Sequence, residues 1–191
     1  MILIIDNYDS FTYNIVEYLN LLNQSCKVIK NDAVSIKDIR LSDSDSIILT
    51  PGPGRPEKAG ITLDVIHQFK KHHPILGICL GHEAIGLYFG GKIIHAPRIC
   101  HGNTSMIEHD NQGVFYQCNN PFLATRYHSL IVDNITAKTT LKVSAWTKEH
   151  QNTIIMGLRH QHYLIESIQF HPESILTENG IKILQNFIKN Q

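Results

Sequence analysis

The sequence carries no excess of charge and no long run of hydrophobic residues. Its 17 lysines and arginines balance 17 aspartates and glutamates among 191 residues, and the basic residues form no block. This balance gives no electrostatic footprint for nucleic acid or an anionic membrane surface. The apolar run at positions 1–5 stops at Asp6 and is too short for a signal peptide or a membrane span. We therefore expect a soluble, cytoplasmic protein that binds neither nucleic acid nor membrane.

Cysteine is scarce and scattered. The four cysteines form no C-x-x-C pair and are Cys26, Cys79, Cys100 and Cys118. This spacing excludes a zinc knuckle and a dithiol motif, and a cytosolic chain forms few disulfides. Among the 12 histidines, His160 and His162 lie two positions apart, a spacing that faces one side of a strand, but they have no cysteine or clear carboxylate partner nearby. We therefore expect no metal site in this chain.

No repeat, low-complexity tract or Gly/Ser/Pro linker divides the chain, so we expect a single domain over residues 1–191. In the first half, short apolar runs alternate with helical periodicity, and Asp9 or Ser10 is the expected N-cap of the first helix. The expected strands are 1–5, 26–30, 46–50 and 75–80, with helices over 11–22, 61–69 and 81–88. This alternation predicts a parallel sheet with right-handed crossovers.

The pattern changes after Gly91, where short strand-like pieces follow one another with few helical periods. The expected strands are 92–94, 105–108, 114–116, 129–132, 141–146, 153–158 and 163–170, and a helix is expected over 181–188. The fold class is therefore α/β, with three layers: a mixed, mostly parallel central sheet flanked by helices.

The most informative segment is an apolar strand that runs into a cysteine and then a helix. Gly77 and Gly81 stand two residues before and two residues after Cys79. Small residues on both sides permit a tight, strained turn, the cysteine version of the strand–turn–helix nucleophile elbow. The helix N-terminus would favour the thiolate, and the Leu80 backbone N–H would face the oxygen of a tetrahedral intermediate. A buried cysteine at a strand end beside a glycine turn is the structural alternative.

A second strand end carries a base and an acid. His171, Pro172 and Glu173 follow an apolar run. Histidine is the usual base for a cysteine nucleophile, and a carboxylate can orient the imidazole and fix its tautomer. Pro172 restricts His171 to an extended conformation. A surface loop that precedes a helix is the alternative for this segment.

A third strand end is followed by Pro51-Gly52-Pro53-Gly54. Two prolines stiffen this loop, and two glycines let its backbone approach a ligand closely. It could aim an N–H group at an anion, as a second oxyanion donor, or be an ordinary surface turn. No G-K-[ST] follows, so it is not a phosphate loop.

Taken together, these segments resemble the class I, triad-type glutamine amidotransferases over essentially the whole chain. Within that family the chain is most similar to the small subunits of anthranilate synthase and aminodeoxychorismate synthase. The Cys79 and His-Pro-Glu segments are typical of the superfamily, and the others narrow the resemblance to the chorismate-using branch. The segments that carry it are 5–12, 51–54, 77–82, 101–102, 126–130 and 170–175.

The resemblance implies a three-layer amidotransferase fold and a glutaminase. Cys79 would attack the side-chain carboxamide of glutamine, His171 would relay protons, and Glu173 would orient His171. Leu80 and Gly54 would supply the oxyanion N–H groups. The residues implied to hold glutamine are Gly52, Pro53, Gly54, Glu83, Ser129 and Leu130.

The resemblance also implies a partner. Ammonia would pass to a larger, chorismate-binding synthase subunit that makes anthranilate for tryptophan, aminodeoxychorismate for folate, or both. No cofactor is implied in this subunit, and Mg²⁺ is expected only in the partner. The sequence does not separate the two pathways.

Two residues depart from the family pattern. Glu83 stands where the family has glutamine, and Asn103 stands where the branch commonly has lysine, which puts a partner contact in doubt. A carboxylate could hold the α-ammonium of glutamine, but it lacks the two donors of an amide. If ionised, it would repel the substrate α-carboxylate or the Cys79 thiolate. We predict an active enzyme with altered glutamine affinity.

Three alternatives are weighed against this interpretation. A phosphate-accepting receiver module would use Asp6 and Asp9, but Thr50-Pro51 stand where the acceptor aspartate would be. A catalytically impaired subunit that only stabilises its partner is suggested by Glu83 and opposed by the intact triad. A different cysteine hydrolase on a similar sheet is disfavoured by the branch-specific segments.

Overall fold

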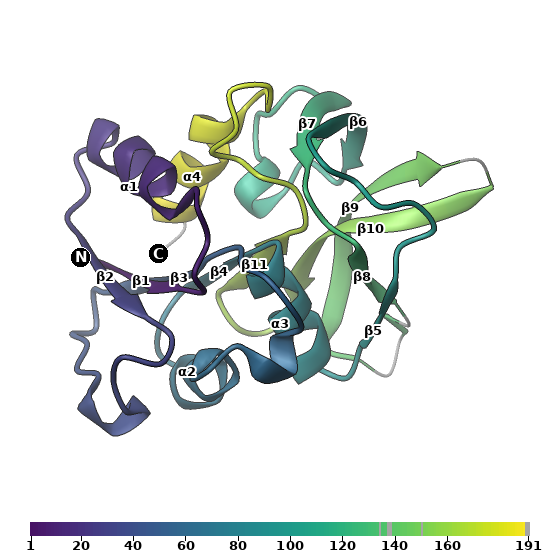
Figure 1. Ribbon diagram of the computed structural model, residues 1–191. Coiled ribbons are helices and arrows are strands. Elements are labelled where there is room, and N and C mark those ends of the chain that lie inside the picture. The colour runs from purple at the N-terminus through teal and green to yellow at the C-terminus, as the bar shows by residue number, and fades with distance from the viewer. Residues whose placement is uncertain (134, 137–138, 150, 190–191) are drawn as a thin grey trace.

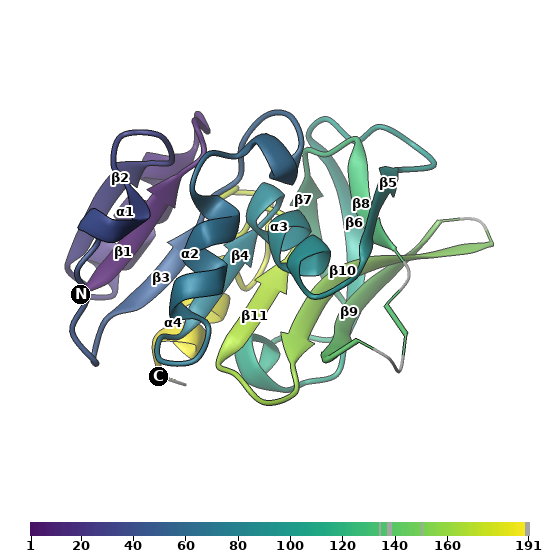
Figure 2. The same ribbon diagram turned by 90° about the horizontal axis from the view of Figure 1, so that it is seen from below.

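Short apolar segments form the parallel part of the sheet, as their composition predicts. The computed structural model describes residues 1–133, 135–136, 139–149 and 151–189. Five adjacent strands are parallel and are, in spatial order, β2 (Cys26–Lys30), β1 (Ile2–Asp6), β3 (Ser46–Leu49), β4 (Ile75–Ile78) and β11 (Ile165–Ile168). Figure 2 shows these strands side by side. Their carboxyl ends therefore meet at one edge of the sheet.

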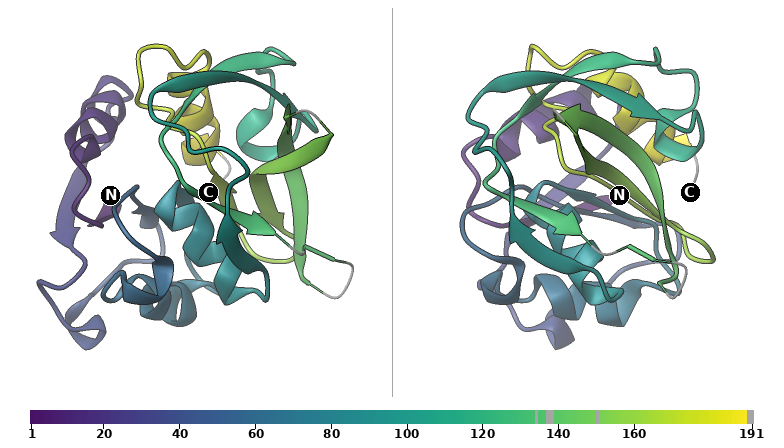
Figure 3. Two further views of the ribbon diagram at one scale, coloured as in Figure 1. Left: turned by 45° about the vertical axis from the view of Figure 1, so that its right-hand side comes forward. Right: turned by 90° about the vertical axis from the view of Figure 1, so that its right-hand side faces the viewer.

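Antiparallel strands extend the same sheet to nine strands in the described part of the chain. They are β10 (Asn152–His160), β9 (Leu141–Glu149), β6 (Asn103–His109) and β7 (Phe122–Arg126), in that spatial order. A separate antiparallel ribbon joins β5 (Lys92–His95) to β8 (Leu130–Asp133). Figure 3 shows the long β9–β10 pair and the curved β6–β7 pair beyond it. The predicted mixed sheet is confirmed.

Helices cover both faces of the parallel strands, which confirms the three layers. Helices α1 (Thr12–Leu21) and α4 (Gly180–Lys189) lie on one face, and α2 (Thr62–Phe69) and α3 (Leu80–Tyr88) lie on the other (Figure 1). Alternate residues of β1 are buried on opposite faces of the sheet. Ile2 and Ile4 pack with α1 and α4, whereas Leu3 and Ile5 pack with α2 and α3. A continuous apolar strand is therefore buried on both faces.

Two local predictions are wrong. Segment 114–116 is not a strand: a 3₁₀ helix spans Gly113–Phe115, with Gly113 at a φ of 56°. Its apolar side chains are buried as those of a strand would be, and so short a run does not distinguish the two. The sequence pattern also failed to predict strand β7. The first helix has Phe11, rather than Asp9 or Ser10, at its N-cap, with no side-chain cap.

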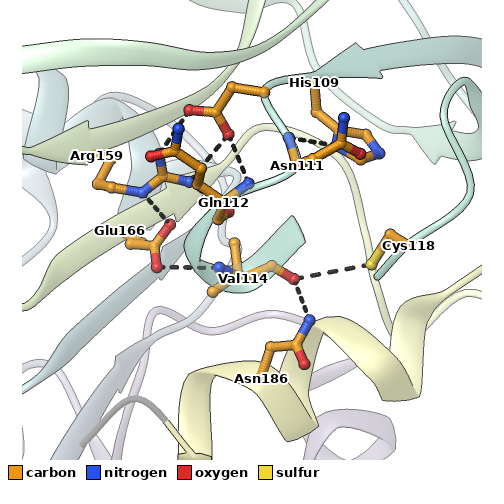
Figure 4. A network of polar contacts seen from close by, with 9 residues as sticks. His109, Asn111, Gln112, Val114, Cys118, Arg159, Glu166 and Asn186 are labelled. Carbon is orange, nitrogen blue, oxygen red and sulfur yellow. Dashed lines mark hydrogen bonds and ion pairs between the residues drawn. The ribbon is translucent and has the colours of Figure 1, made fainter. Parts of the chain in front are cut away.

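A polar network fixes the 3₁₀ segment to the sheet (Figure 4). Arg159 of β10 binds both carboxylate oxygens of Asp110 and, through Nε at 3.0 Å, the Glu166 carboxylate of β11. Glu166 in turn accepts the Val114 backbone N–H at 3.0 Å, while Asn186 of α4 donates to the Val114 carbonyl at 2.9 Å. This network joins β10, β11 and α4 to the loop that connects β6 and β7 and contains the 3₁₀ segment. No helix of the described residues is long and apolar enough to cross a membrane.

Candidate active site

Cys79 lies between β4 and α3 in a strained backbone conformation. It is the N-cap of α3, with φ 51° and ψ −102°, a combination that non-glycine residues rarely adopt. A Cβ at Gly77 would lie 2.4 Å from the Gly81 carbonyl oxygen, and a Cβ at Gly81 would lie 2.3 Å from the Leu49 carbonyl oxygen. Only glycine fits at both positions. The predicted elbow is therefore present, and β3 packs directly against it.

His171 and Glu173 follow β11, the strand adjacent to β4. His171 Nδ1 lies 2.5 Å from Glu173 Oε1, and both side chains are buried. The backbone is held by its own bonds: His171 N–H donates to the Thr125 carbonyl at 3.0 Å, and the Thr177 hydroxyl donates to the His171 carbonyl at 2.7 Å. With Nδ1 bonded to the carboxylate, Nε2 is buried without a hydrogen-bond partner among the described residues. That nitrogen is free to exchange a proton.

Cys79 and His171 affect each other's ionisation. Burial raises the pKa of the Cys79 thiol, and His171 opposes this effect by lowering the same pKa. Burial alone would lower the pKa of His171, but Cys79 and Glu173 raise it well above its ordinary value. The sequence predicts the helix N-terminus that favours the thiolate, but not the burial that opposes it. The thiol and the imidazole therefore form one coupled acid–base pair.

The predicted glutamine-binding residues come together around the nucleophile. A cavity of about 170 Å³ is lined by Gly52, Pro53, Gly54, Cys79, Glu83, Tyr127, His128, Ser129 and Leu130. These residues come from the loop after β3, the start of α3 and the segment that leads into β8. Its volume is several times the ~30 Å³ that one water molecule occupies in the liquid. Leu80 does not line this cavity, but as the first residue of α3 its N–H has no acceptor within the helix.

Glu83 lies one helical turn after Cys79 and is only 3% exposed. Its backbone N–H donates to the Cys79 carbonyl at 3.0 Å, which holds it in the first turn of α3. Burial raises the pKa of its carboxyl group to about 7, although a hydrogen bond from Gln169 lowers it. At neutral pH this carboxyl group is therefore divided between its charged and neutral forms.

Sequence reasoning assigned no role to several residues of the site. Asn7 joins the ends of β1 and β3: its Nδ2 donates to the Thr50 carbonyl and its backbone N–H donates to the Thr50 hydroxyl, both at 2.9 Å. Gly52 packs on it, since a Cβ there would lie 2.3 Å from the Asn7 carbonyl oxygen. A polar residue directly after a buried strand was the available signal for Asn7.

The segment before β8 also contributes more than the sequence indicated. The Cys79 thiol donates to the Tyr127 carbonyl at 3.9 Å, and the Tyr127 ring lies 5.2 Å from that of His171, centroid to centroid. His128 accepts a hydrogen bond from the buried Arg126 guanidinium at 2.9 Å. Burial and the Arg126 charge lower the pKa of His128 to about 4, so it stays neutral. No spacing in the sequence places this segment beside Cys79.

Within the described ranges, no three side chains of histidine, cysteine, aspartate or glutamate are arranged to hold a metal ion. His160 accepts the backbone N–H groups of His162 and Tyr163 at its Nδ1, both at 3.0 Å, and its ring stacks on that of Tyr163. Its contacts are those of a turn. The groups that this site offers for chemistry are a thiol, an imidazole that can exchange its proton, and a carboxylate that orients the imidazole.

Comparison with known proteins places this geometry in a family. The family described as glutamine amidotransferase class-I matches residues 3–191. Anthranilate synthase component 2 of Porphyra purpurea is 50% identical over 98% of both chains. Aminodeoxychorismate/anthranilate synthase component 2 of Bacillus subtilis is 48% identical over 99% of this chain and 96% of that one.

Two further comparisons concern proteins of Thermotoga maritima: one is similar in sequence and the other in fold. The bifunctional protein TrpGD of Thermotoga maritima is 47% identical over all of this chain, which spans about a third (32%) of its length. The crystal structure of a glutamine amidotransferase from Thermotoga maritima has a TM-score of 0.75 over 99% of this chain and 80% of its own, at 15% identity. That likeness shows the fold alone. The family match and the identities along the full chain together show that this protein belongs to the class I glutamine amidotransferases.

Proposed function

We propose that this chain is the glutaminase component of a chorismate-aminating synthase, with Cys79, His171 and Glu173 as its catalytic residues. The observation that carries the proposal is the cavity in which the strained Cys79 meets Gly52, Pro53, Gly54, Glu83, Ser129 and Leu130. A thiol at a helix start, beside a buried imidazole that a carboxylate orients, is the arrangement that nucleophilic acyl transfer requires.

The first half of the reaction forms a thioester. The Cys79 proton moves to Nε2 of His171, and the sulfur attacks the carboxamide carbon of glutamine while the carbonyl electron pair moves to oxygen. The N–H groups of Leu80 and Gly54 stabilise that oxyanion. When the intermediate collapses, the C–N bond breaks, His171 gives its proton to the nitrogen, and ammonia leaves.

The second half releases glutamate. His171 takes a proton from water, and the resulting hydroxide attacks the thioester carbon. Collapse breaks the C–S bond, and the sulfur recovers a proton from His171. Glu173 stabilises the imidazolium in both halves through its 2.5 Å contact with Nδ1.

The proposal includes a partner, because three relatives, at 50%, 46% and 48% identity, are named as component 2 of anthranilate synthase or of aminodeoxychorismate/anthranilate synthase. The ammonia would be delivered to a chorismate-binding component 1, for anthranilate, aminodeoxychorismate or both. Exposed apolar side chains beside the site are typical of a surface that a partner covers, and Phe11 and Ile175 line one groove together with Glu173. We expect no metal or cofactor in this subunit, with Mg²⁺ needed only by the partner. The proposed location is the cytoplasm, where the four free thiols stay reduced.

The test is ammonia release from glutamine by the purified protein, alone and with component 1 from the same cell, beside a Cys79→Ser control. Turnover that rises with the partner and disappears in the variant would support the proposal. Adding chorismate and identifying the aminated product would then name the pathway. A folded protein that binds component 1 but never releases ammonia would instead support the alternative of a catalytically impaired, structural subunit.

A further inference from the structure

Gln169 is the one side chain that hydrogen-bonds to both Cys79 and Glu83 in the described part of the chain. It follows β11, two residues before His171, and is fully buried. Its Nε2 lies 3.2 Å from Glu83 Oε1 and 3.8 Å from Cys79 Sγ. Its backbone is fixed by donation to the Met156 carbonyl at 2.9 Å. The carboxamide therefore stands as a bridge between the nucleophile and the carboxyl group of the glutamine cavity.

This bridge can adapt to the protonation of its two neighbours. With Nε2 toward them, the amide donates to a thiolate and to a carboxylate. Its Oε1 is buried with no partner among the residues that the structure describes. Rotation of the amide group by half a turn would bring Oε1 toward the same two neighbours, where it could accept hydrogen bonds from a Cys79 thiol and a neutral Glu83 carboxyl group. A buried polar atom without a partner is costly, so a second use for it is expected.

We propose that Gln169 is a positioning residue whose carboxamide couples Glu83 to Cys79, so that the charge of Glu83 controls how readily the Cys79 thiolate forms. This inference rests on the proposed function only in taking Cys79 as the nucleophile. Glutamine would then be attacked most readily while Glu83 is neutral.

The charges around Glu83 support this coupling. Its carboxyl group has a pKa raised by burial to about 7, and Arg55 and Glu57 from the loop after β3 act on it in opposite directions. His128, on the far wall of the cavity, stays neutral. Burial is the main cause that raises the pKa of Cys79; His171 lowers this pKa, and Glu83 and Glu173 raise it further. The pKa of Glu83 therefore places the change of its charge in the neutral range.

The expected size follows from the two distances. Since Nε2 lies 3.8 Å from the sulfur and 3.2 Å from Oε1, those two atoms are at most about 7 Å apart. Two negative charges at that separation reduce thiolate formation between about three-fold and fifty-fold, according to the effective dielectric constant.

The test is the rate of Cys79 alkylation by iodoacetamide between pH 6 and pH 8.5, followed on the Cys79 peptide of the full-length protein. Iodoacetamide is uncharged and alkylates the thiolate form of cysteine, so the alkylation rate reports the thiolate fraction of Cys79 without requiring glutamine turnover. The variants are Glu83→Gln and Gln169→Leu, and the matched control is Glu57→Gln, which removes an exposed carboxylate of the same neighbourhood.

We expect Glu83→Gln and the unmodified protein to react alike at pH 6, and the variant to react at least about three-fold faster at pH 8.5. Gln169→Leu should react at least about three-fold more slowly at pH 8.5, because the Cys79 thiolate loses its amide donor. The inference is overturned if the ratio of the Glu83→Gln rate to the unmodified rate does not change with pH, if Glu57→Gln produces the same change, or if Gln169→Leu reacts as the unmodified protein does. Should Gln169→Leu not fold, Gln169→Asn, which keeps the amide but shortens its reach to Cys79 and Glu83, takes its place with the same expected direction. A protein that shows this pattern but releases no ammonia would contradict the proposed function and leave the coupling intact.

Discussion

Replacing Glu83 by glutamine should stabilise the fold in a pH-dependent manner. The folded protein holds a proton on Glu83 up to a pKa of about 7, whereas the unfolded chain loses it near the ordinary value of 4.5. Between these values the folded state binds more protons than the unfolded state, so stability falls as the pH rises. Above pH 7 Glu83 is ionised in both the folded and the unfolded state, and the free energy of unfolding falls no further. Glu83→Gln has no such proton to lose.

The magnitude follows from the shift. A pKa raised from 4.5 to about 7 corresponds to about 3 kcal/mol at 1.36 kcal/mol per pKa unit. Because Glu83 is only 3% exposed, solvent screening reduces this little. Urea unfolding of both proteins between pH 5 and pH 8 measures it. The advantage of Glu83→Gln should grow by about 2–3 kcal/mol across this range and then level off. An advantage that stays constant with pH would refute the reasoning.

The same change should lower the KM for glutamine. An amide at position 83 offers two donors and no charge, whereas an ionised carboxylate repels the substrate α-carboxylate. The effect should be larger at pH 8 than at pH 6.5, where part of Glu83 is neutral. Steady-state ammonia release at the two pH values measures it, and an unchanged or higher KM in the variant would count against Glu83 as a glutamine-binding residue.

Three further changes test other parts of the account. Glu173→Gln should lower kcat about 100-fold or more, because His171 loses the carboxylate that fixes its tautomer; a loss under ten-fold in the ammonia assay would argue against that role. Gly52→Ala should raise the KM for glutamine about ten-fold or more, since its Cβ would meet the Asn7 carbonyl oxygen at 2.3 Å and displace the loop; an unaltered KM would mean that the loop does not shape the cavity. Arg159→Leu leaves two carboxylates of the network in Figure 4 unpaired and should cost about 1–3 kcal/mol in urea unfolding, with kcat unchanged at 25 °C.

Much of the catalytic geometry was predictable because it depends on local rules. A strand that ends in a cysteine between two glycines can make only a few turns, and the structure explains both glycines by backbone contacts under 2.5 Å. The His-Pro-Glu segment is equally local. Periodicity does not settle strand order, so the sequence did not predict that β4 and β11 are neighbours, which brings these two segments together.

What the sequence did not reveal depends on contacts between distant segments. Gln169 and Glu83 are 86 positions apart, and no periodic pattern connects them. Cys79 and Glu83, whose pKa values are raised by burial, share their cavity with Tyr127 to Leu130, which are distant from both in the sequence. The 3₁₀ helix at 113–115 replaces a predicted strand because Glu166 and Asn186 bond its backbone from elsewhere in the chain.

The central claim is that Cys79 carries the γ-glutamyl group during turnover. The most direct measurement mixes the protein with radiolabelled glutamine, quenches it with acid within the first turnover, and locates the label by peptide mapping. The account predicts label on the Cys79 peptide, released by hydroxylamine as a thioester should be, and none in Cys79→Ala. Glutamate formation at an undiminished rate by Cys79→Ala, or with label only elsewhere in the chain, would contradict it.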